Sequence, residues 1–404
     1  MPDRSWKVHL CSIILAVMAA MWLADLYLVV TTPPTMAEAA RAAGKPFDTR
    51  DRVQVLADLR RSGADACRSI TPIFFLETDG LTSGGKKLYP LGGISRKLTL
   101  GNNETGAFGI YTSDEHGFNN PVGLHGGSLD AALVGDSFTH GHLIEAGSDI
   151  ASWLRKRGVT ALNLGMSGAG PLEELAIMTE YALPARPRVL LWLYYEGNDL
   201  ADLSRSSTCP TMMRYLEDEY SQGLAHRQAE IDDALTRFVE DGERKARALP
   251  DRDESRAVRK SPIVRVLKLE DLRGRLDVMR KVKATEQTLS LFRDVLAAAK
   301  RRVERTHGKM VFVYLPEWYR YGYGWQKHES FRDRRKVLAT VAALGIPMID
   351  IHETFSGQPD PLSFFPFRLY GHYTPEGFRL VADTIARRLK EANLEATAPG
   401  RSAP

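Results

Sequence analysis

The sequence predicts an α/β protein with three layers, in which helices cover both faces of a central parallel sheet. Short apolar runs alternate with longer amphipathic segments from about residue 131 onward, as repeated β–α units do. Three of the apolar runs end just before polar or glycine-rich turns, and such turns gather at the carboxyl edge of a parallel sheet. A chain of 404 residues with 44% hydrophobic and 26% charged residues can bury a sizeable core.

The N-terminus predicts membrane association. Residues 10–30 are almost all apolar and follow Arg4 and Lys7, so they suit one membrane span with the body of the protein translocated. A cleaved signal peptide is the alternative interpretation. The apolar run continues through residues 26–30, past signal-peptide length, and this favours an uncleaved anchor over residues 1–31.

Residues 32–110 are predicted to be a stalk followed by an N-terminal loop region. The proline- and alanine-rich residues 32–48 resemble a membrane-proximal stalk, residues 53–61 a short helix, and residues 70–76 a strand. Residues 112–120 are expected to be an ordered loop close to the functional site.

The predicted core strands and helices follow in alternation. The strands are expected at residues 131–134, 161–164, 189–194, 310–315 and 347–351. The helices are expected at residues 142–157, 172–181, 289–306, 331–344 and 376–392. Pro171 suits the first turn of a helix, and Gly158 and Gly345 suit helix C-termini.

The core domain is therefore expected to comprise residues 111–199 and 308–396, with a tail at 397–404. Residues 200–307 form a helical insert close to domain size, with helical periodicity at 212–239 and 263–282. Both a solvated helical flap and a lid or partner-docking subdomain are consistent with this pattern.

Ser137 is the first candidate for chemistry. It follows a buried strand and precedes a helix, which presents its hydroxyl at the sheet's carboxyl edge beside helix amides. A serine nucleophile in acyl transfer needs this arrangement. Gly-Asp-Ser is also a common turn, but three further stretches agree with the functional interpretation: NLGMSGAG at 163–170, VLLWLYYEGND at 189–199, and YGHYTPEGF at 370–378.

With these four blocks in this order, the chain resembles the SGNH/GDSL hydrolase superfamily. The resemblance spans roughly residues 112–389 and implies a flavodoxin-like αβα fold. Ser137 matches the nucleophile and His372 the general base. The amides of Ser137 and Gly168, with the side chain of Asn198, match the oxyanion hole.

One position departs from the family pattern. The family usually has an Asp two or three residues before the His, where this chain has Leu369 and Tyr370. A triad needs a third group to orient the imidazole. Either the protein uses a Ser–His dyad, or a carboxylate comes from elsewhere, with Asp360 and Glu376 as the nearest candidates in sequence.

Two other clusters were weighed as ligand sites. His140 and His142 lie beside the nucleophile, but no third ligand of suitable spacing is evident, so no metal site is predicted. The segment WYRYGYGW at 318–325 offers Trp318, Tyr321 and Trp325 as sugar-binding aromatics, and packing against the insert is the alternative.

The three cysteines leave one question open. Cys67 and Cys209 would face an oxidising compartment if the body is exported, and they could pair or remain free thiols.

The predicted function is serine-dependent ester hydrolysis or O-acyl (acetyl) transfer, with no cofactor. The resemblance implies a bacterial inner-membrane protein with a single span and a periplasmic catalytic domain, acting on an acyl ester or acylated polysaccharide, with a membrane partner in polysaccharide modification. The net charge of +4 does not argue for nucleic acid. A non-catalytic polysaccharide-binding or assembly factor and a lipase or phospholipase are the alternatives.

Overall fold

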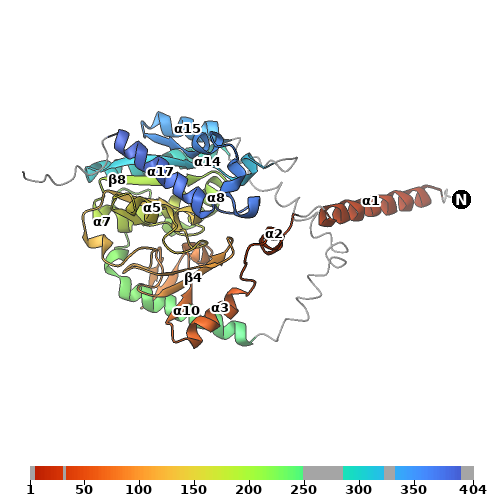
Figure 1. The fold of residues 1–404 in the computed structure, drawn as a ribbon, viewed down its shortest axis with the longest axis horizontal. Helices are drawn as coiled ribbons and strands as arrows, with labels where there is room; N and C mark the ends of the chain where they lie inside the picture. Colours follow the sequence, from red (N-terminus) through yellow and green to blue (C-terminus); the bar gives the residue numbers. More distant parts are fainter. Residues whose placement is uncertain (1–4, 31–32, 249–284, 323–332, 393–404) are drawn as a thin grey trace, which may run out of the picture. The chain divides into compact units, whose positions relative to one another are not determined.

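The computed structural model describes residues 5–30, 33–248, 285–322 and 333–392 (Figure 1). The chain divides into two compact units, one of Met1–Thr35 with Val239–Val282, and one of Met36–Phe238 with Lys283–Pro404. The second unit holds every strand that the structure describes. We describe each unit by itself.

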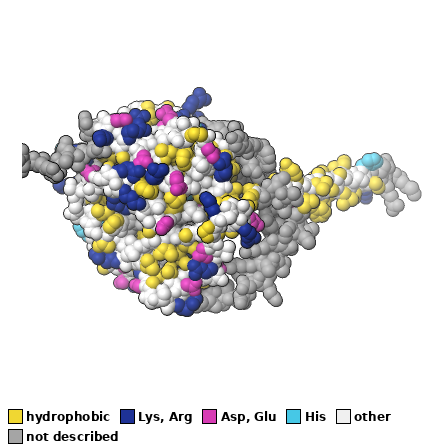
Figure 2. Space-filling view, viewed as in Figure 1, with side chains coloured by type: hydrophobic (Ala, Val, Ile, Leu, Met, Phe, Trp, Pro, Cys, Tyr) yellow, Lys and Arg dark blue, Asp and Glu magenta, His cyan; other side chains and the backbone are white. Residues whose placement is uncertain are grey.

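The first unit contains the N-terminal helix α1, Ser5–Val30. Its segment Trp6–Leu28 is long and apolar enough to cross a membrane, and a signal sequence near an N-terminus meets the same criterion. Figure 2 shows apolar side chains along this helix, and both signs of charge interspersed on the visible face of the other unit.

The second unit is built on a five-stranded parallel sheet with the strand order β7-β6-β8-β9-β10. These strands are β6 (Ala131–Gly135), β7 (Ala161–Asn163), β8 (Val189–Tyr195), β9 (Lys309–Leu315) and β10 (Met348–Asp350). In chain order this is 2-1-3-4-5, a doubly wound arrangement whose direction reverses between β6 and β8. Ligands bind at the carboxyl ends of the strands at such a switch point.

Helices cover both faces of this sheet, which gives the predicted three layers (Figure 1). On one face, α5 (Ile150–Arg155) packs with α17 (Pro375–Glu391). On the other, α14 (Glu286–Arg305) packs with α6 (Pro171–Ile177) and α8 (Asp199–Ser206). The remaining core helices are α15 (Arg334–Ala343) and α16 (Ile351–Ser356).

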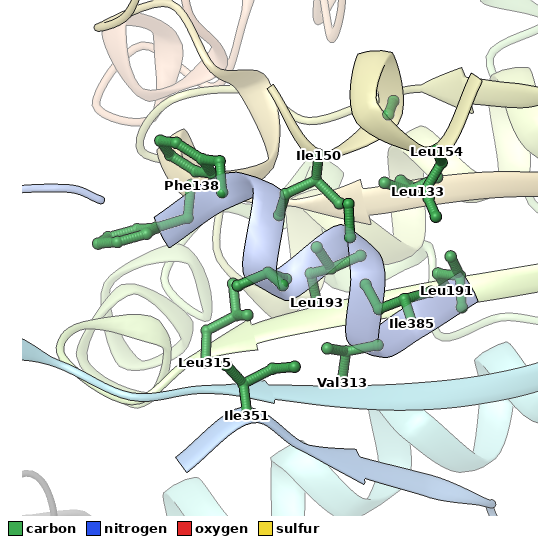
Figure 3. Close-up of a cluster of buried hydrophobic side chains, with 14 of the residues drawn as sticks. Leu133, Phe138, Ile150, Leu154, Leu191, Leu193, Val313, Leu315, Ile351 and Ile385 are labelled. Atoms are coloured by element: carbon green, nitrogen blue, oxygen red, sulfur yellow. The ribbon is translucent and has the colours of Figure 1, made fainter. Parts of the chain in front are cut away.

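Alternation along the strands assigns their side chains to the two faces. Leu133, Leu191 and Val313 point toward the α5–α17 layer, where they meet Ile150 and Ile385 (Figure 3). The intervening residues face α14, and the rings of Tyr194, Phe292 and Phe312 contact one another there. Every residue of β8 is buried, as expected for a central parallel strand.

Residues 36–110 form ordered structure rather than a stalk and loops. Helices α2 (Met36–Ala42) and α3 (Arg52–Arg61) belong to the same unit as the main sheet, and Ala40 is fully buried. A second sheet has the order β1-β4-β5 and comprises Ala66–Arg68, Leu98–Asn103 and Phe108–Thr112. The alternation of Leu98 and Leu100, and of Phe108 and Ile110, is the sequence signal for β4 and β5 that our prediction missed.

Several predicted boundaries differ from the structure. The helix expected at 142–157 is reduced to α5, which begins after its cap Asp149. A separate short helix, α4 (Ser137–His140), precedes it and ends at Gly141, which has a φ of 69°. The strand expected at 70–76 is the 3-10 helix η1, Pro72–Phe75. Leu81–Ser83 and Lys86–Leu88 form the hairpin β2–β3. The helix expected at 172–181 continues from α6 as a π-helical turn, Met178–Ala182, and then α7, Leu183–Ala185.

The predicted insert begins and ends with helices of the core, since α8 and α14 pack on the main sheet's helical layer. Between them lie α9 (Pro210–Arg214), the 3-10 turn η4 (Leu224–His226) and α10 (Gln228–Ala248). The helix expected at 263–282, the tail at 397–404 and Trp325 lie outside the described residues.

The hairpin β4–β5 docks closely on the loop that follows α4. A Cβ on Gly101 would lie 1.8 Å from the His142 carbonyl oxygen, and one on Gly109 would lie 2.3 Å from it. The Asn102 amide donates to the same oxygen at 3.2 Å, beside an irregularity in the strand register. Glycine at both positions therefore allows backbone to meet backbone.

We expect Gly101→Ala to lower the free energy of unfolding by about 1–3 kcal/mol, the usual cost of overpacking a site that can relax only by moving backbone. Urea denaturation measures this. Gly126→Ala is the control, because a Cβ there meets nothing within 4 Å. Equal stability of the Gly101 and Gly126 variants would contradict the close docking.

Candidate active site

Ser137 begins α4 directly after β6, at the switch point of the sheet. Asp136 caps the helix by accepting a hydrogen bond from the Phe138 amide at 2.9 Å. Gly135 has no room for a side chain, because its Cβ would lie 2.1 Å from Thr139 Oγ1 and 2.9 Å from the Leu193 carbonyl. This tight turn fixes Ser137, which is 9% exposed, at the carboxyl edge.

His372 meets Ser137 from the loop before α17. Its Nε2 lies 2.7 Å from Ser137 Oγ, a hydrogen-bond distance. The imidazole packs against the ring of Phe138, with 4.4 Å between centroids. Next to it, Tyr373 donates to the Pro316 carbonyl at 2.6 Å, and Thr374 caps α17. The two sequence-predicted residues are therefore together in the fold, 235 positions apart in the chain.

The carboxylate on His372 is Glu104, which the sequence analysis did not identify. His372 Nδ1 lies 3.0 and 3.1 Å from the two oxygens of Glu104, and the His372 backbone amide donates to Oε2 at 2.8 Å. Glu104 follows β4 in the turn of the β4–β5 hairpin. No motif near the histidine could reveal it, because the contact joins residues 268 positions apart.

Neither carboxylate predicted for this role contacts His372. Asp360 forms an ion pair with Arg368, and Glu376 is an exposed residue in the first turn of α17. Both expectations rested on closeness in sequence and were wrong.

Gly371 lets the carboxylate approach. A Cβ at this position would lie 3.0 Å from Glu104 Oε2 and 2.7 Å from Met36 Cε. A glycine before the histidine therefore leaves room for the carboxylate of this ion pair.

The charges of this pair act on each other. Burial alone lowers the pKa of His372, but the charge and hydrogen bond of Glu104, with the charge of Asp136, outweigh it and raise the pKa above 6.5. Burial raises the pKa of Glu104, yet the contacts with His372 outweigh that effect and lower it. The arrangement favours an imidazolium held beside a carboxylate.

Gly168 lies in the turn after β7, with a φ of 75° that disfavours other residues. Its α-carbon faces Ile73, which a Cβ would meet at 3.2 Å. In the described part of the chain, neither the Gly168 amide nor the Ser137 amide donates a hydrogen bond to another residue. Both N–H groups are thus available to an acceptor.

Asn198 occupies the N-cap position of α8, just after β8, and makes no side-chain cap hydrogen bond. Its Nδ2 donates to Asp202 at 2.8 Å, and burial raises the pKa of Asp136 while a hydrogen bond from the Asn198 side chain acts against that rise. These contacts hold the side chain of Asn198 next to Asp136, the residue before Ser137. The side-chain amide of Asn198 is therefore hydrogen-bonded to carboxylates.

Acidic side chains lie buried beneath the site. Glu174 and Asp199 are fully buried, and both Glu174 oxygens and one Asp199 oxygen have no hydrogen-bond partner among the described residues. Burial, reinforced by neighbouring carboxylates, raises the pKa of each well above its ordinary value. Their protonated forms are therefore favoured, which limits negative charge under Ser137.

His140 has a structural position. Its Nδ1 accepts from the Ser167 amide at 3.2 Å, so its Nε2 carries the proton and donates to the Tyr111 hydroxyl at 2.7 Å. Burial lowers the pKa of His140 to about 3. His140, in α4, is thus hydrogen-bonded both to β5 through Tyr111 and to the turn that carries Gly168 through the Ser167 amide. His142 stacks on it at 4.4 Å, and no cluster of potential metal ligands occurs among the described residues.

The aromatic segment after β9 is held at the same edge of the sheet. Arg320 pairs with the buried carboxylate of Glu196, which also accepts from the Glu317 amide at 2.8 Å. Trp318 donates to the Arg368 carbonyl at 2.9 Å, and Tyr321 packs into the core with its hydroxyl 2.9 Å from His352 Nδ1. Tyr321 is thus engaged in packing against the main core, rather than against the insert. Cys67 and Cys209 are free thiols.

Comparisons with known proteins give only distant likenesses. No family model and no curated protein matches the sequence. A lipolytic protein of the G-D-S-L family from Desulfitobacterium hafniense DCB-2 is 12% identical, with a TM-score of 0.36 over 64% of this chain and 97% of that one. The lipase/acylhydrolase from Enterococcus faecalis is 14% identical, with a TM-score of 0.35 over 65% and 96%.

A two-domain esterase active on acetylated mannans is 14% identical, with a TM-score of 0.35 over 69% of this chain and 53% of that one. Likenesses with TM-scores below 0.5 do not assign a function to this chain.

We expect His372 to titrate above 6.5, and Glu104→Gln to lower that pKa, because the charge that raises it is removed while the burial that lowers it remains. NMR titration of the imidazole measures both values. Glu376→Gln serves as the control and should leave the His372 pKa unchanged. A wild-type His372 that titrates below 6.5 would contradict the proposed charge balance.

Proposed function

We propose that this protein is a serine-dependent ester hydrolase or O-acyltransferase. The hydrogen-bonded chain from Ser137 through His372 to Glu104 carries the proposal. A hydroxyl, an imidazole and a carboxylate in that order, at 2.7 and 3.0 Å, form the arrangement of a nucleophile, its base and the group that orients the base. The site lies where doubly wound sheets bind ligands.

In the first half-reaction, Ser137 Oγ attacks the acyl carbonyl while His372 Nε2 takes the hydroxyl proton. Glu104 holds Nδ1–H and stabilises the imidazolium. The free amides of Ser137 and Gly168 would bind the oxyanion, with Asn198 beside them. Collapse of the tetrahedral intermediate expels the alcohol, which receives the proton from Nε2, and leaves the acyl group on Ser137.

In the second half-reaction, His372 deprotonates the acceptor, which attacks the Ser137 ester and releases the acyl group. Water as the acceptor gives an esterase, and a carbohydrate hydroxyl gives an O-acetyltransferase. We propose an acylated cell-surface carbohydrate as the substrate. If α1 stays uncleaved as a membrane anchor, the site would act outside the cytoplasmic membrane.

The alternative of a non-catalytic binding protein rested on the lack of an acid beside His372 in the sequence. Glu104 supplies that acid and removes the reason for the alternative.

Turnover of p-nitrophenyl acetate tests the proposed activity. We expect Ser137→Ala and His372→Ala to lose roughly 10³-fold or more in kcat, since members of a triad act as a unit. Glu104→Gln should lose on the order of 10²–10⁴-fold, because the base loses its orienting partner. Asp360→Asn and Glu376→Gln are the controls, because each also replaces a carboxylate by its amide, and they should leave the activity unchanged. Equal activity of wild type and Ser137→Ala, with no fluorophosphonate labelling of Ser137, would refute a serine mechanism.

The pH profile gives a separate test. His372 must be neutral to act as the base, so kcat/KM should rise with pH through the raised pKa of His372, above 6.5. In Glu104→Gln, the acidic limb of the kcat/KM profile should shift to lower pH, because no carboxylate stabilises the imidazolium and the pKa of His372 falls. An acidic limb at the same pH in both proteins would show that another group titrates.

A further inference from the structure

Tyr370 lies at the edge of the candidate site, two residues before His372, with 56% of its surface exposed. Tyr370 and Leu369 occupy the positions where the superfamily usually has its acid. Because Glu104 reaches His372 from β4, neither residue has to supply a carboxylate. The segment before the histidine is therefore free to present another kind of side chain to a substrate.

Aromatic neighbours hold the Tyr370 ring. Its centroid lies 5.0 Å from that of Tyr319, with an interplanar angle of 36°, and 6.5 Å from that of Trp318, at 89°. Trp318 is itself fixed by its hydrogen bond to the Arg368 carbonyl and by packing against the main core. Tyr370 thus presents a supported ring rather than a freely rotating surface side chain.

The Tyr370 hydroxyl is available and protonated. Among the described residues it has no hydrogen-bond partner. Partial burial, with the charges of Tyr319, Glu317, Glu104 and Asp136, raises the pKa of Tyr370 to about 12. Tyr370 is two residues before His372 in the same loop, which places its backbone next to the candidate site.

We infer that Tyr370, supported by Tyr319 and Trp318, forms the subsite for the sugar ring of an O-acylated carbohydrate. A pyranose ring has an apolar face of C–H groups, which stacks on an aromatic ring, and a rim of hydroxyls, which accept hydrogen bonds. Tyr370 offers both partners at once. An aliphatic acyl chain would use the ring and leave the hydroxyl unpaired, which is unfavourable once water is displaced.

This inference rests on the proposed function and deepens it by assigning the alcohol side of the ester. It makes Tyr370 a substrate-binding residue that discriminates among esters, rather than a member of the triad. This role predicts that a substitution at Tyr370 affects some ester substrates more than others. Changes at Tyr370 should affect esters of sugars more than an ester that lacks a sugar ring.

The test compares kcat/KM for acetate release from partially O-acetylated xylo-oligosaccharide with that for p-nitrophenyl acetate. For Tyr370→Ala, the loss on the oligosaccharide should exceed the loss on p-nitrophenyl acetate by about tenfold, chiefly through KM. Tyr370→Phe should lose less, because it keeps the ring. Met348→Ala is the control, an exposed residue at the amino end of β10 and so at the opposite edge of the sheet.

Equal losses on both substrates would overturn the subsite and place Tyr370 in support of His372. A selective loss on p-nitrophenyl octanoate would overturn it in favour of an acyl-chain site. Calorimetric titration of Ser137→Ala with the oligosaccharide, with and without Tyr370→Ala, tests the subsite without turnover. Sugar binding that depends on Tyr370 would uphold the inference even if the protein hydrolyses no ester. Binding that is unchanged by Tyr370→Ala, or absent from the Ser137→Ala protein, would refute it.

Discussion

The ion pair between Glu104 and His372 is the contact on which the candidate site depends. It joins the small N-terminal sheet to the loop before α17, and both carboxylate oxygens take part through the imidazole and the backbone amide. Without it, burial would lower the pKa of His372, and packing on Phe138 would remain as the described contact of the imidazole ring besides Ser137. Gly371 leaves room for this contact, since a Cβ there would lie 3.0 Å from Glu104 Oε2.

Ser137 and the carboxylate that contacts His372 come from two different sheets, rather than the carboxylate coming from a short motif just before the histidine. The main sheet positions Ser137 and the free amides, because strand ends at a switch point bring together residues from β6, β7 and β8. The hairpin of the second sheet carries Glu104, which contacts His372. The segment before the histidine carries Tyr370, whose ring is exposed and whose hydroxyl has no hydrogen-bond partner among the described residues.

Polar groups around Ser137 are arranged so that few full charges are buried without partners. The pKa values of Glu174 and Asp199 are raised by burial, so their protonated forms are favoured. His140 is neutral and fixed in one tautomer by Tyr111 and the Ser167 amide. The buried carboxylate of Glu196 is matched by Arg320. The ion pair of Glu104 and His372 is next to Ser137, and the proposed mechanism would use a change in the protonation state of its imidazole.

The sequence alone determined the layered α/β class and the five core strands, and it singled out Ser137, Gly168, Asn198 and His372 as candidates, because apolar periodicity and short motifs at strand ends are local signals. It also showed that the usual acid was missing. Only the tertiary structure decided where the acid comes from, since Glu104 reaches His372 through a hairpin 268 residues earlier in the chain. The same limit explains why residues 36–48 were interpreted as a stalk and Asp360 as a candidate acid. Sequence distance ranks partners by proximity along the chain, whereas packing in the folded protein brings distant residues together, backbone against backbone at Gly101 and side chain against backbone at Gly371.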